Sequence, residues 1–183
     1  AQKSLALFAR REYGKGSFDY RFFADKPITK FESIILRNGG NDWDYAIFRD
    51  GLVSTIVRDM DIDRLAFQPA IVYLNGEYWG ILNIREKINT NYLAENHFAD
   101  PANVNLLEDN SVVVDGTNTT YKQLTNYLNA NTLETEEKYI QAASQIDINN
   151  FIQYQLTEIY IDNRDWPGNN VKFWNTNEPG SRW

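Results

Sequence analysis

The sequence feature that most constrains the fold is a β-hairpin pattern in the first half of the chain. Two segments rich in β-branched and aromatic residues, 70–74 and 77–84, are separated only by Asn75 and Gly76. Both turn residues accept positive φ, which a two-residue type I′ turn requires at each of its positions. The pattern predicts two antiparallel strands joined by a tight turn.

Shorter apolar segments around the hairpin predict further strands and one helix in the first half. Residues 3–11 and 31–37 have the composition of strands and are followed by glycine-containing turns. Residues 50–60 are predicted to form a helix, because their apolar residues recur at helical spacing. We expect four of these residues to face a core: Leu52, Val53, Ile56 and Val57.

The second half is predicted to be mostly helical, with helices at 89–95 and 121–128 and a third that begins at Thr135. Thr135 is a favourable N-cap, and the two glutamates after it lie where the helix dipole favours negative charge. The strongest helical pattern begins at Asp147 or Asn149, and one face of that helix is predicted to be buried. Its apolar residues are Ile148, Phe151, Ile152, Leu156, Ile159 and Tyr160.

Two short strands, 104–107 and 171–175, are expected among these helices. The polar segment 108–120 is predicted to be a loop or a small hairpin around its Asp-Gly pair at 115 and 116. A strand-rich first half followed by a helical second half indicates an α+β fold. We expect two lobes with a cleft between them, residues 1–88 and 89–183.

The composition excludes several classes of function. A net charge of −7 argues against nucleic acid or an anionic membrane as the main partner. The absence of Cys excludes a thiol nucleophile and a Cys zinc site, and the single His97, expected at the surface, excludes a His-based metal cluster. No apolar run is long enough to span a membrane. No signal peptide is evident, and the abrupt start and end suggest a fragment of a longer protein.

A candidate active-site loop follows the strongest helix, at residues 163–170, with the sequence Asn-Arg-Asp-Trp-Pro-Gly-Asn-Asn. The Arg-Asp pair and the final Asn have the spacing of a protein-kinase catalytic loop, H-R-D-x-x-x-x-N. That chemistry needs a carboxylate to accept a hydroxyl proton and a nearby amide oxygen to hold Mg²⁺. Asp165 would be the base and Asn170 the metal ligand. Because these are also common loop residues, the alternative is a solvated turn between a helix and a strand.

Other segments share a family pattern with this loop: Gln2–Leu5, Leu36–Asp42, Arg49-Asp50, Tyr73–Ile81 and Arg85–Ile88. Together they make the chain resemble, over almost its whole length, the CotH family of spore-coat protein H-like atypical kinases. The block Asn-Gly-Glu-Tyr-Trp-Gly is the most specific part of the resemblance. The polar segment 108–120 contributes little to it.

The resemblance implies a reduced protein-kinase-like fold, with a β-rich first lobe that contains one helix and a mostly helical second lobe. It implies transfer of the γ-phosphoryl group of ATP to Ser or Thr of a protein substrate, with Mg²⁺ or Mn²⁺ as the metal. It also implies a location outside the cell or on the surface of a cell or spore.

The resemblance further implies roles for individual residues in the loop. Asp165 matches the proton-accepting Asp, and Asn170 matches the metal-binding Asn. Asp162 is the rival carboxylate, but it lacks the required spacing to Asn170, and Asn169 is the rival amide.

Two residues outside the loop would bind the nucleotide. Lys3 lies where the family has a basic residue for the nucleotide phosphates, and the alternative is a frayed terminal lysine. Glu86 lies where the hairpin meets the second lobe and could contact the nucleotide, or it could be a surface salt-bridge partner of Arg85 or Lys87. Two arginines are expected to orient the cleft or to have a purely structural role: Arg37 and Arg49.

The sequence departs from the kinase pattern in two ways. Gly14 and Gly16 occur singly, so no glycine-rich phosphate loop is present. No Asp follows Asn170, whereas kinases hold a metal with a second Asp downstream of the catalytic loop. The family pattern places that Asp shortly after Trp183, so either the chain is a fragment that ends before it or the protein lacks it. In both cases residues 1–183 alone would be expected to be inactive. A non-catalytic surface or coat-assembly module with the same fold is therefore the main alternative, and a carbohydrate-binding β-domain is a weaker one.

Overall fold

The Asn75-Gly76 hairpin forms as predicted in the computed structural model, which describes residues 2–183. Strand β5 (Phe67–Leu74) pairs antiparallel with β6 (Glu77–Glu86). The φ angles of Asn75 and Gly76 are 52° and 86°, so both turn positions have the positive φ that a type I′ turn requires.

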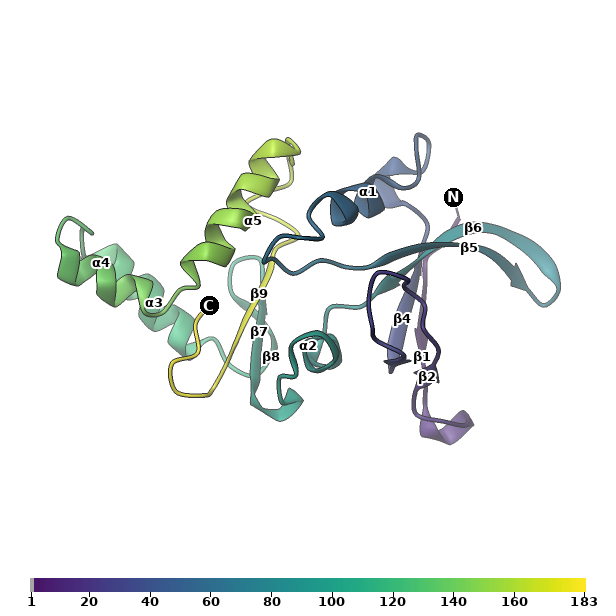
Figure 1. The fold of residues 1–183 in the computed structure, drawn as a ribbon, viewed down its shortest axis with the longest axis horizontal. Coiled ribbons are helices and arrows are strands. Elements are labelled where there is room, and N and C mark those ends of the chain that lie inside the picture. The colour runs from purple at the N-terminus through teal and green to yellow at the C-terminus, as the bar shows by residue number, and fades with distance from the viewer. Residues whose placement is uncertain (1) are drawn as a thin grey trace. The chain divides into compact units, whose positions relative to one another are not determined.

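The hairpin belongs to a four-stranded antiparallel sheet with the strand order β1-β4-β6-β5 (Figure 1). Strand β1 (Leu5–Phe8) pairs with β4 (Ser33–Arg37), and β4 pairs with β6. Strand β1 is shorter than the strand predicted over residues 3–11. The sheet therefore joins the first strand of the chain to the hairpin through β4.

An aromatic segment packs against one face of this sheet. Its ends form a two-stranded ladder, β2 (Phe18–Asp19) with β3 (Lys30–Phe31), so the single strand predicted over 31–37 is divided between β3 and β4. The ring of Phe31 lies 5.6 Å from the rings of both Phe22 and Phe23 in edge-on contacts. The buried core consists of Phe23, Phe31, Ile34 and Ala66, with Leu7, Phe18, Phe22, Ile28 and Ile84 packed around it.

Helix α1 (Arg49–Ile56) packs with a different face from the one predicted. Leu52 and Ile56 are 49% and 54% exposed, whereas the helix buries Gly51 and Ser54. The ring of Phe67 lies where a Cβ on Gly51 would be, 2.4 Å from the nearest ring atoms. The helix therefore turns its small residues toward the sheet, which apolar periodicity alone cannot indicate. Val57, just after the helix, is buried as predicted.

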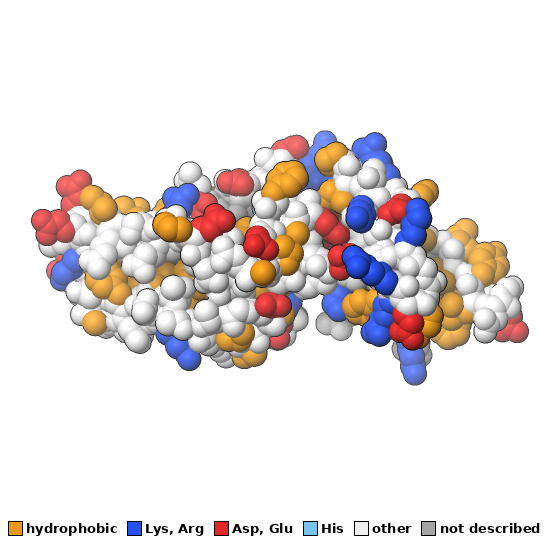
Figure 2. Space-filling model, turned by 90° about the horizontal axis from the view of Figure 1, so that it is seen from below, with side chains coloured by type: hydrophobic (Ala, Val, Ile, Leu, Met, Phe, Trp, Pro, Cys, Tyr) orange, Lys and Arg blue, Asp and Glu red, His pale blue; other side chains and the backbone are white. Residues whose placement is uncertain are grey.

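The far end of the β5–β6 hairpin carries exposed apolar side chains. Tyr73 and Tyr78 are 61% and 62% exposed, and their rings contact each other edge-on at 5.8 Å. Ile71 and Ile81 are exposed as well. Figure 2 shows hydrophobic side chains gathered at this end of the hairpin.

The second half contains a three-stranded antiparallel sheet with the order β8-β7-β9. The central strand β7 (Val104–Glu108) is the most deeply buried, and it pairs with β8 (Val112–Asp115) and β9 (Lys172–Thr176). The segment predicted as a loop or small hairpin is thus a hairpin. Its turn lies at Asp109 to Ser111 instead of at the Asp-Gly pair, and both of these residues have positive φ.

Three helices accompany this sheet: α3 (Thr119–Ala130), α4 (Glu136–Ala143) and α5 (Ile148–Tyr160). The predicted caps are confirmed, because the side chain of Thr135 accepts from the Lys138 N–H and that of Asp147 from the Asn150 N–H.

The predicted buried face of α5 is not buried. Phe151, Leu156 and Ile159 are 52%, 58% and 65% exposed, whereas Thr157 is buried. The periodicity identifies an apolar stripe on the helix but not the side that packs.

The chain divides into two compact units, Ala1–His97 and Phe98–Trp183. Helix α2 (Thr90–His97) belongs to the first unit, beyond the lobe boundary expected at residue 88. The described residues form a mixed α/β structure with five α-helices and antiparallel sheets. A kinase-like arrangement of two lobes stays a prediction. None of the helices in residues 2–183 is long and apolar enough to cross a membrane.

Candidate functional site

The candidate loop begins where α5 ends in a Schellman motif. The Asn163 N–H donates to the Glu158 carbonyl at 3.1 Å, and the Asp162 N–H donates to the Ile159 carbonyl at 3.2 Å. Asp162 has a φ of 51°, in the left-handed conformation that this motif requires at its turning residue. The motif satisfies the last carbonyl groups of the helix and directs the chain into the loop.

The side chain of Asn163 then connects the helix to the loop. Its Nδ2 donates to Oε2 of Glu158 at 2.6 Å, and its Oδ1 accepts from the Asp165 N–H at 3.1 Å. An Asn side chain that accepts from the N–H two residues later forms an Asx turn. The Asn163 side chain therefore links the backbone at Asp165 to Glu158 of α5.

The two residues predicted to share one reacting centre lie together. Asn170 Nδ2 donates to Oδ2 of Asp165 at 3.4 Å, and both side chains are exposed. Asn170 has a φ of 61°, a conformation that Asn tolerates better than most residues. The rival carboxylate, Asp162, pairs instead with Arg164 at 3.2 Å. The loop thus presents a carboxylate beside an amide whose oxygen is available to a cation.

The other end of the loop is fixed to the β7–β8 turn. The Val171 N–H donates to Oδ1 of Asp109 at 3.1 Å, and the Asp109 N–H donates to the Val171 carbonyl at 2.8 Å. The next residue, Lys172, forms an ion pair with Glu108 across the β7–β9 ladder. Both ends of the loop are thereby held by regular structure of the second unit.

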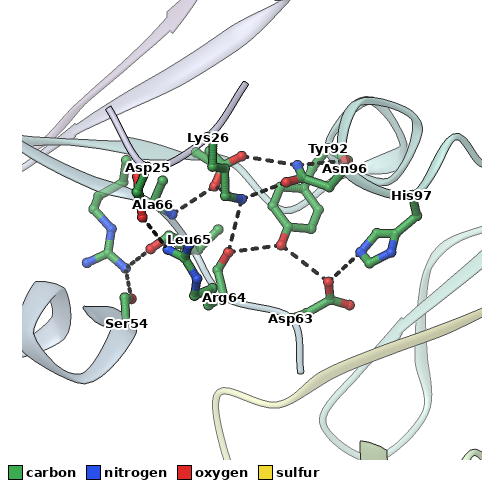
Figure 3. A network of polar contacts seen from close by, with 12 residues as sticks. Asp25, Lys26, Ser54, Asp63, Arg64, Leu65, Ala66, Tyr92, Asn96 and His97 are labelled. Atoms are coloured by element: carbon green, nitrogen blue, oxygen red, sulfur yellow. Dashed lines mark hydrogen bonds and ion pairs between the residues drawn. The ribbon is translucent and has the colours of Figure 1, made fainter. Parts of the chain in front are cut away.

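Figure 3 shows a polar network in the first unit around Lys26, Tyr92 and Asn96. Glu86 belongs to this network through its bond with Lys26. Its side chain is 2% exposed, and its Oε2 lies 2.7 Å from Nζ of Lys26. The Ala66 N–H also donates to Oε2 at 2.7 Å, and Asn96 Nδ2 donates to Oε1 at 3.0 Å. The alternative of a surface salt bridge with Arg85 or Lys87 is therefore wrong, because the carboxylate is buried and paired with Lys26. The carboxylate is almost fully enclosed, so a direct nucleotide contact would require this network to open.

Lys26, the partner of Glu86, is a candidate that the sequence did not single out. Its side chain is 10% exposed, and besides Glu86 its ammonium donates to Asn96 Oδ1 at 2.6 Å. The sequence suggests only that Lys26-Pro27 ends a strand. The available signal was a charged pair, Asp25-Lys26, between the apolar segments Phe22–Ala24 and Pro27-Ile28.

The network continues to the end of α2. The Tyr92 hydroxyl donates to the Arg64 carbonyl at 3.0 Å and lies 3.3 Å from Oδ1 of Asp63, and burial raises the pKa of this phenol. His97, predicted at the surface, is partly exposed and pairs with Asp63 at 2.5 Å. A pocket of about 160 Å³ opens beside this network. It is lined by Lys26, Ile62, Asp63, Arg64, Tyr92, Asn96 and His97.

Lys3 lies on the surface just before β1. Leu5 pairs with Leu36, whereas Glu86 pairs with Ile34 toward the other end of β4. This register offsets Lys3 from Glu86 by roughly 13 Å along the strand direction, and β4 lies between their strands. The structure therefore does not bring the two predicted nucleotide-binding residues into contact with each other.

The arginines expected to orient the cleft have structural partners. Nε of Arg37 lies 2.8 Å from Asp50 on α1, and Arg49 lies 3.3 Å from Asp42. The buried carboxylate of Asp42 also accepts from the Arg49 N–H at 2.9 Å, and this backbone hydrogen bond lowers the pKa of Asp42. These contacts fix the start of α1, which supports the structural role for Arg37 and Arg49.

A divalent metal ion fits the chemistry of the loop. Mg²⁺ binds hard oxygen ligands and commonly takes one or two protein side chains together with substrate phosphates. Asn170 and Asp165 supply an amide oxygen and a carboxylate. Among residues 2–183, no cluster of three or more His, Cys, Asp and Glu side chains could hold a metal alone. The remaining ligands would have to come from phosphate oxygens, water or another carboxylate.

A comparison with protein families gives one match that covers the chain. The family described as CotH kinase protein matches residues 1–183. A search of curated proteins finds no match.

Proposed function

The chain belongs to the CotH kinase protein family, and from that premise we propose that it transfers the γ-phosphoryl group of ATP to Ser or Thr of a protein. The observation that carries the proposal is the approach of Asp165 and Asn170 to 3.4 Å on one loop. This is the pair of groups that phosphoryl transfer to a hydroxyl needs, one for the proton and one for the metal.

In this mechanism the Asp165 carboxylate accepts the proton of the substrate hydroxyl as the hydroxyl oxygen attacks the γ-phosphorus. The bond between the γ-phosphorus and the bridging oxygen breaks, and ADP leaves. Its exposed position suits a base that must reach a side chain on another protein. The Asn170 amide oxygen would hold Mg²⁺ or Mn²⁺, which when bound neutralises the phosphate charge. General base catalysis of this kind contributes about 10²–10⁴-fold to a rate.

Two residues of the first unit are proposed to serve the nucleotide. The exposed Lys3 ammonium suits a phosphate contact as a mobile point charge. Glu86 would act either directly or by holding Lys26 in the buried ion pair. Family membership also supports a location at a cell or spore surface.

The proposal is tested with the longest native form of the protein that contains residues 1–183, called the extended protein below, because the family resemblance implies a second metal-binding Asp beyond Asn170. Transfer of labelled γ-phosphate from ATP to a protein is measured with Mg²⁺ and with Mn²⁺. Asp165→Asn is expected to reduce transfer by about 10²-fold or more. Asp162→Asn is the matched control, because it removes a carboxylate three residues away that is paired with Arg164. Equal transfer by Asp165→Asn and the unmodified protein would refute Asp165 as the base.

A non-catalytic surface or coat-assembly module is the second candidate. Exposed Ile71, Tyr73 and Tyr78 at the end of the β5–β6 hairpin favour it, because aromatic and aliphatic side chains of this kind are common at the centres of protein interfaces. Such a module would bind its partner equally well in the Asp165→Asn variant and would transfer no phosphate.

A further inference from the structure

The amide of Asn163 makes two hydrogen bonds whose directions are fixed by chemistry. An ionised Glu158 carboxylate can only accept, and the Asp165 N–H can only donate. The amide must therefore present Nδ2 to Glu158, at 2.6 Å, and Oδ1 to the Asp165 N–H, at 3.1 Å. No other orientation of this side chain satisfies both neighbours.

Glu158 connects this amide to regular structure. It lies on the last full turn of α5, and both Glu158 and Asn163 are half-buried. Tyr154, one turn earlier, also interacts with it. Burial is the main cause that raises the pKa of the Tyr154 phenol, and the nearby Glu158 carboxylate raises it further. The sequence Tyr154–Glu158–Asn163–Asp165 is therefore a continuous set of polar contacts from the helix to the loop.

Asp165 depends on this connection because little else holds it. Its side chain is exposed, and its contact with Asn170 is long, at 3.4 Å. The bond from its N–H to Asn163 fixes the backbone from which the carboxylate projects. Misplacing a reacting group by about 1 Å can cost roughly 10²-fold in rate.

We propose that Asn163, oriented by Glu158, is a positioning residue for the Asp165 carboxylate. The inference rests on the proposed function in that Asp165 is taken as the proton acceptor. Asn163 touches neither substrate nor nucleotide in this account. It acts through the backbone of Asp165, and it stands at the position where the kinase motif has His.

The first test removes the amide. In the extended protein, Asn163→Ala is expected to lower kcat for phosphoryl transfer by about 10–100-fold and to change KM for ATP by less than about threefold. Hydrogen exchange at the Asp165 N–H, measured by NMR, should become at least about tenfold faster, because a bonded amide exchanges only when its bond opens. Asn129→Ala, which removes an exposed amide on α3 of the same unit, is the matched control.

The second test reverses the direction of the bond. Asn163→Asp alone keeps an acceptor for the Asp165 N–H but places two carboxylates together, and it should lower kcat as Asn163→Ala does. Adding Glu158→Gln supplies an amide that can donate to the new carboxylate. The double variant is expected to recover at least about tenfold in kcat over Asn163→Asp alone and to restore slow exchange at Asp165. A simple loss of folding would show no such recovery.

The outcomes separate this inference from the proposed function. Unchanged kcat or unchanged Asp165 exchange in Asn163→Ala overturns the positioning role, and so does a double variant no better than Asn163→Asp. If the extended wild-type protein transfers no phosphate, the proposed function fails. The exchange measurements then decide whether Asn163 tethers Asp165.

Discussion

The Lys26–Glu86 ion pair gives the most demanding prediction about stability. The carboxylate is 2% exposed and the ammonium side chain 10%, with 2.7 Å between Oε2 and Nζ. Removing one member of a buried pair leaves the other charge without its partner, which costs about 3–5 kcal/mol. Lys26→Met keeps the length of the side chain but not its charge. Because Ala66 and Asn96 still donate to the carboxylate, we expect the lower end, about 3 kcal/mol.

A double-mutant cycle isolates the pair from other effects. Glu86→Gln alone leaves a buried ammonium, which still donates to Asn96, and it is expected to cost about 3 kcal/mol. In the double variant both side chains are neutral, so no buried charge is left without a partner. The double variant Lys26→Met with Glu86→Gln should then be at least about 2 kcal/mol more stable than the sum of the single losses predicts.

The measurement should report on the first unit alone. Urea denaturation followed by hydrogen exchange at β6 amides does so, because β6 is a central strand of that unit. Lys15→Met is the control, since the Lys15–Asp19 pair is a solvent-exposed ion pair and should contribute little. A coupling energy below about 0.5 kcal/mol would contradict the reasoning, because it would mean that the charges are effectively solvated.

Three further perturbations test particular features of the structure. Burial raises the pKa of Glu95 to about 7 from its ordinary 4.5, so the folded state holds a proton that the unfolded chain releases, and stability falls as pH rises between these values. Glu95→Gln should therefore raise the free energy of unfolding by about 1 kcal/mol at pH 8 but leave it unchanged at pH 4, with the half-exposed position limiting the gain. Gly51→Ala should lower the free energy of unfolding by about 2 kcal/mol, since its Cβ would lie 2.4 Å from Phe67, whereas Gly168→Ala meets nothing within 4 Å. Asp162→Gly should raise the melting temperature, because glycine takes the φ of 51° without the steric cost of a side chain, about 1 kcal/mol. Urea titration of the first two variants and calorimetry of the third check these values, and an opposite sign in any of them refutes its argument.

Local signals in the sequence predict local structure well in this chain. The Asn75-Gly76 turn, the cap at Thr135 and the strand over 104–107 depend on short-range backbone preferences, and all three form. The predictions of which faces of α1 and α5 are buried were wrong. A stripe such as Leu52 and Ile56 identifies an apolar surface, but the partner that a helix packs against is set by distant residues.

In the candidate site, too, local features were predictable from the sequence and long-range contacts were not. The spacing from Asp165 to Asn170 is local, and the loop brings their side chains together. The partner of Glu86 is not local, because Lys26 is 60 residues away and reaches it only through the packing of the aromatic segment on the sheet. The contact between Asn163 and Glu158 cannot be predicted without knowing where α5 ends and how the chain turns there.

The most direct test of the account asks whether Asp165 and Asn170 serve one reacting centre. The rate of phosphoryl transfer from ATP is measured at saturating Mn²⁺ for Asp165→Asn, Asn170→Ala and the double variant of the extended protein. When two residues act as a unit, the effects of replacing them are strongly non-additive. The rate of the double variant should therefore lie within about threefold of the rate of the slower single variant. Losses that multiply, or a single variant that keeps the full rate, would contradict the claim.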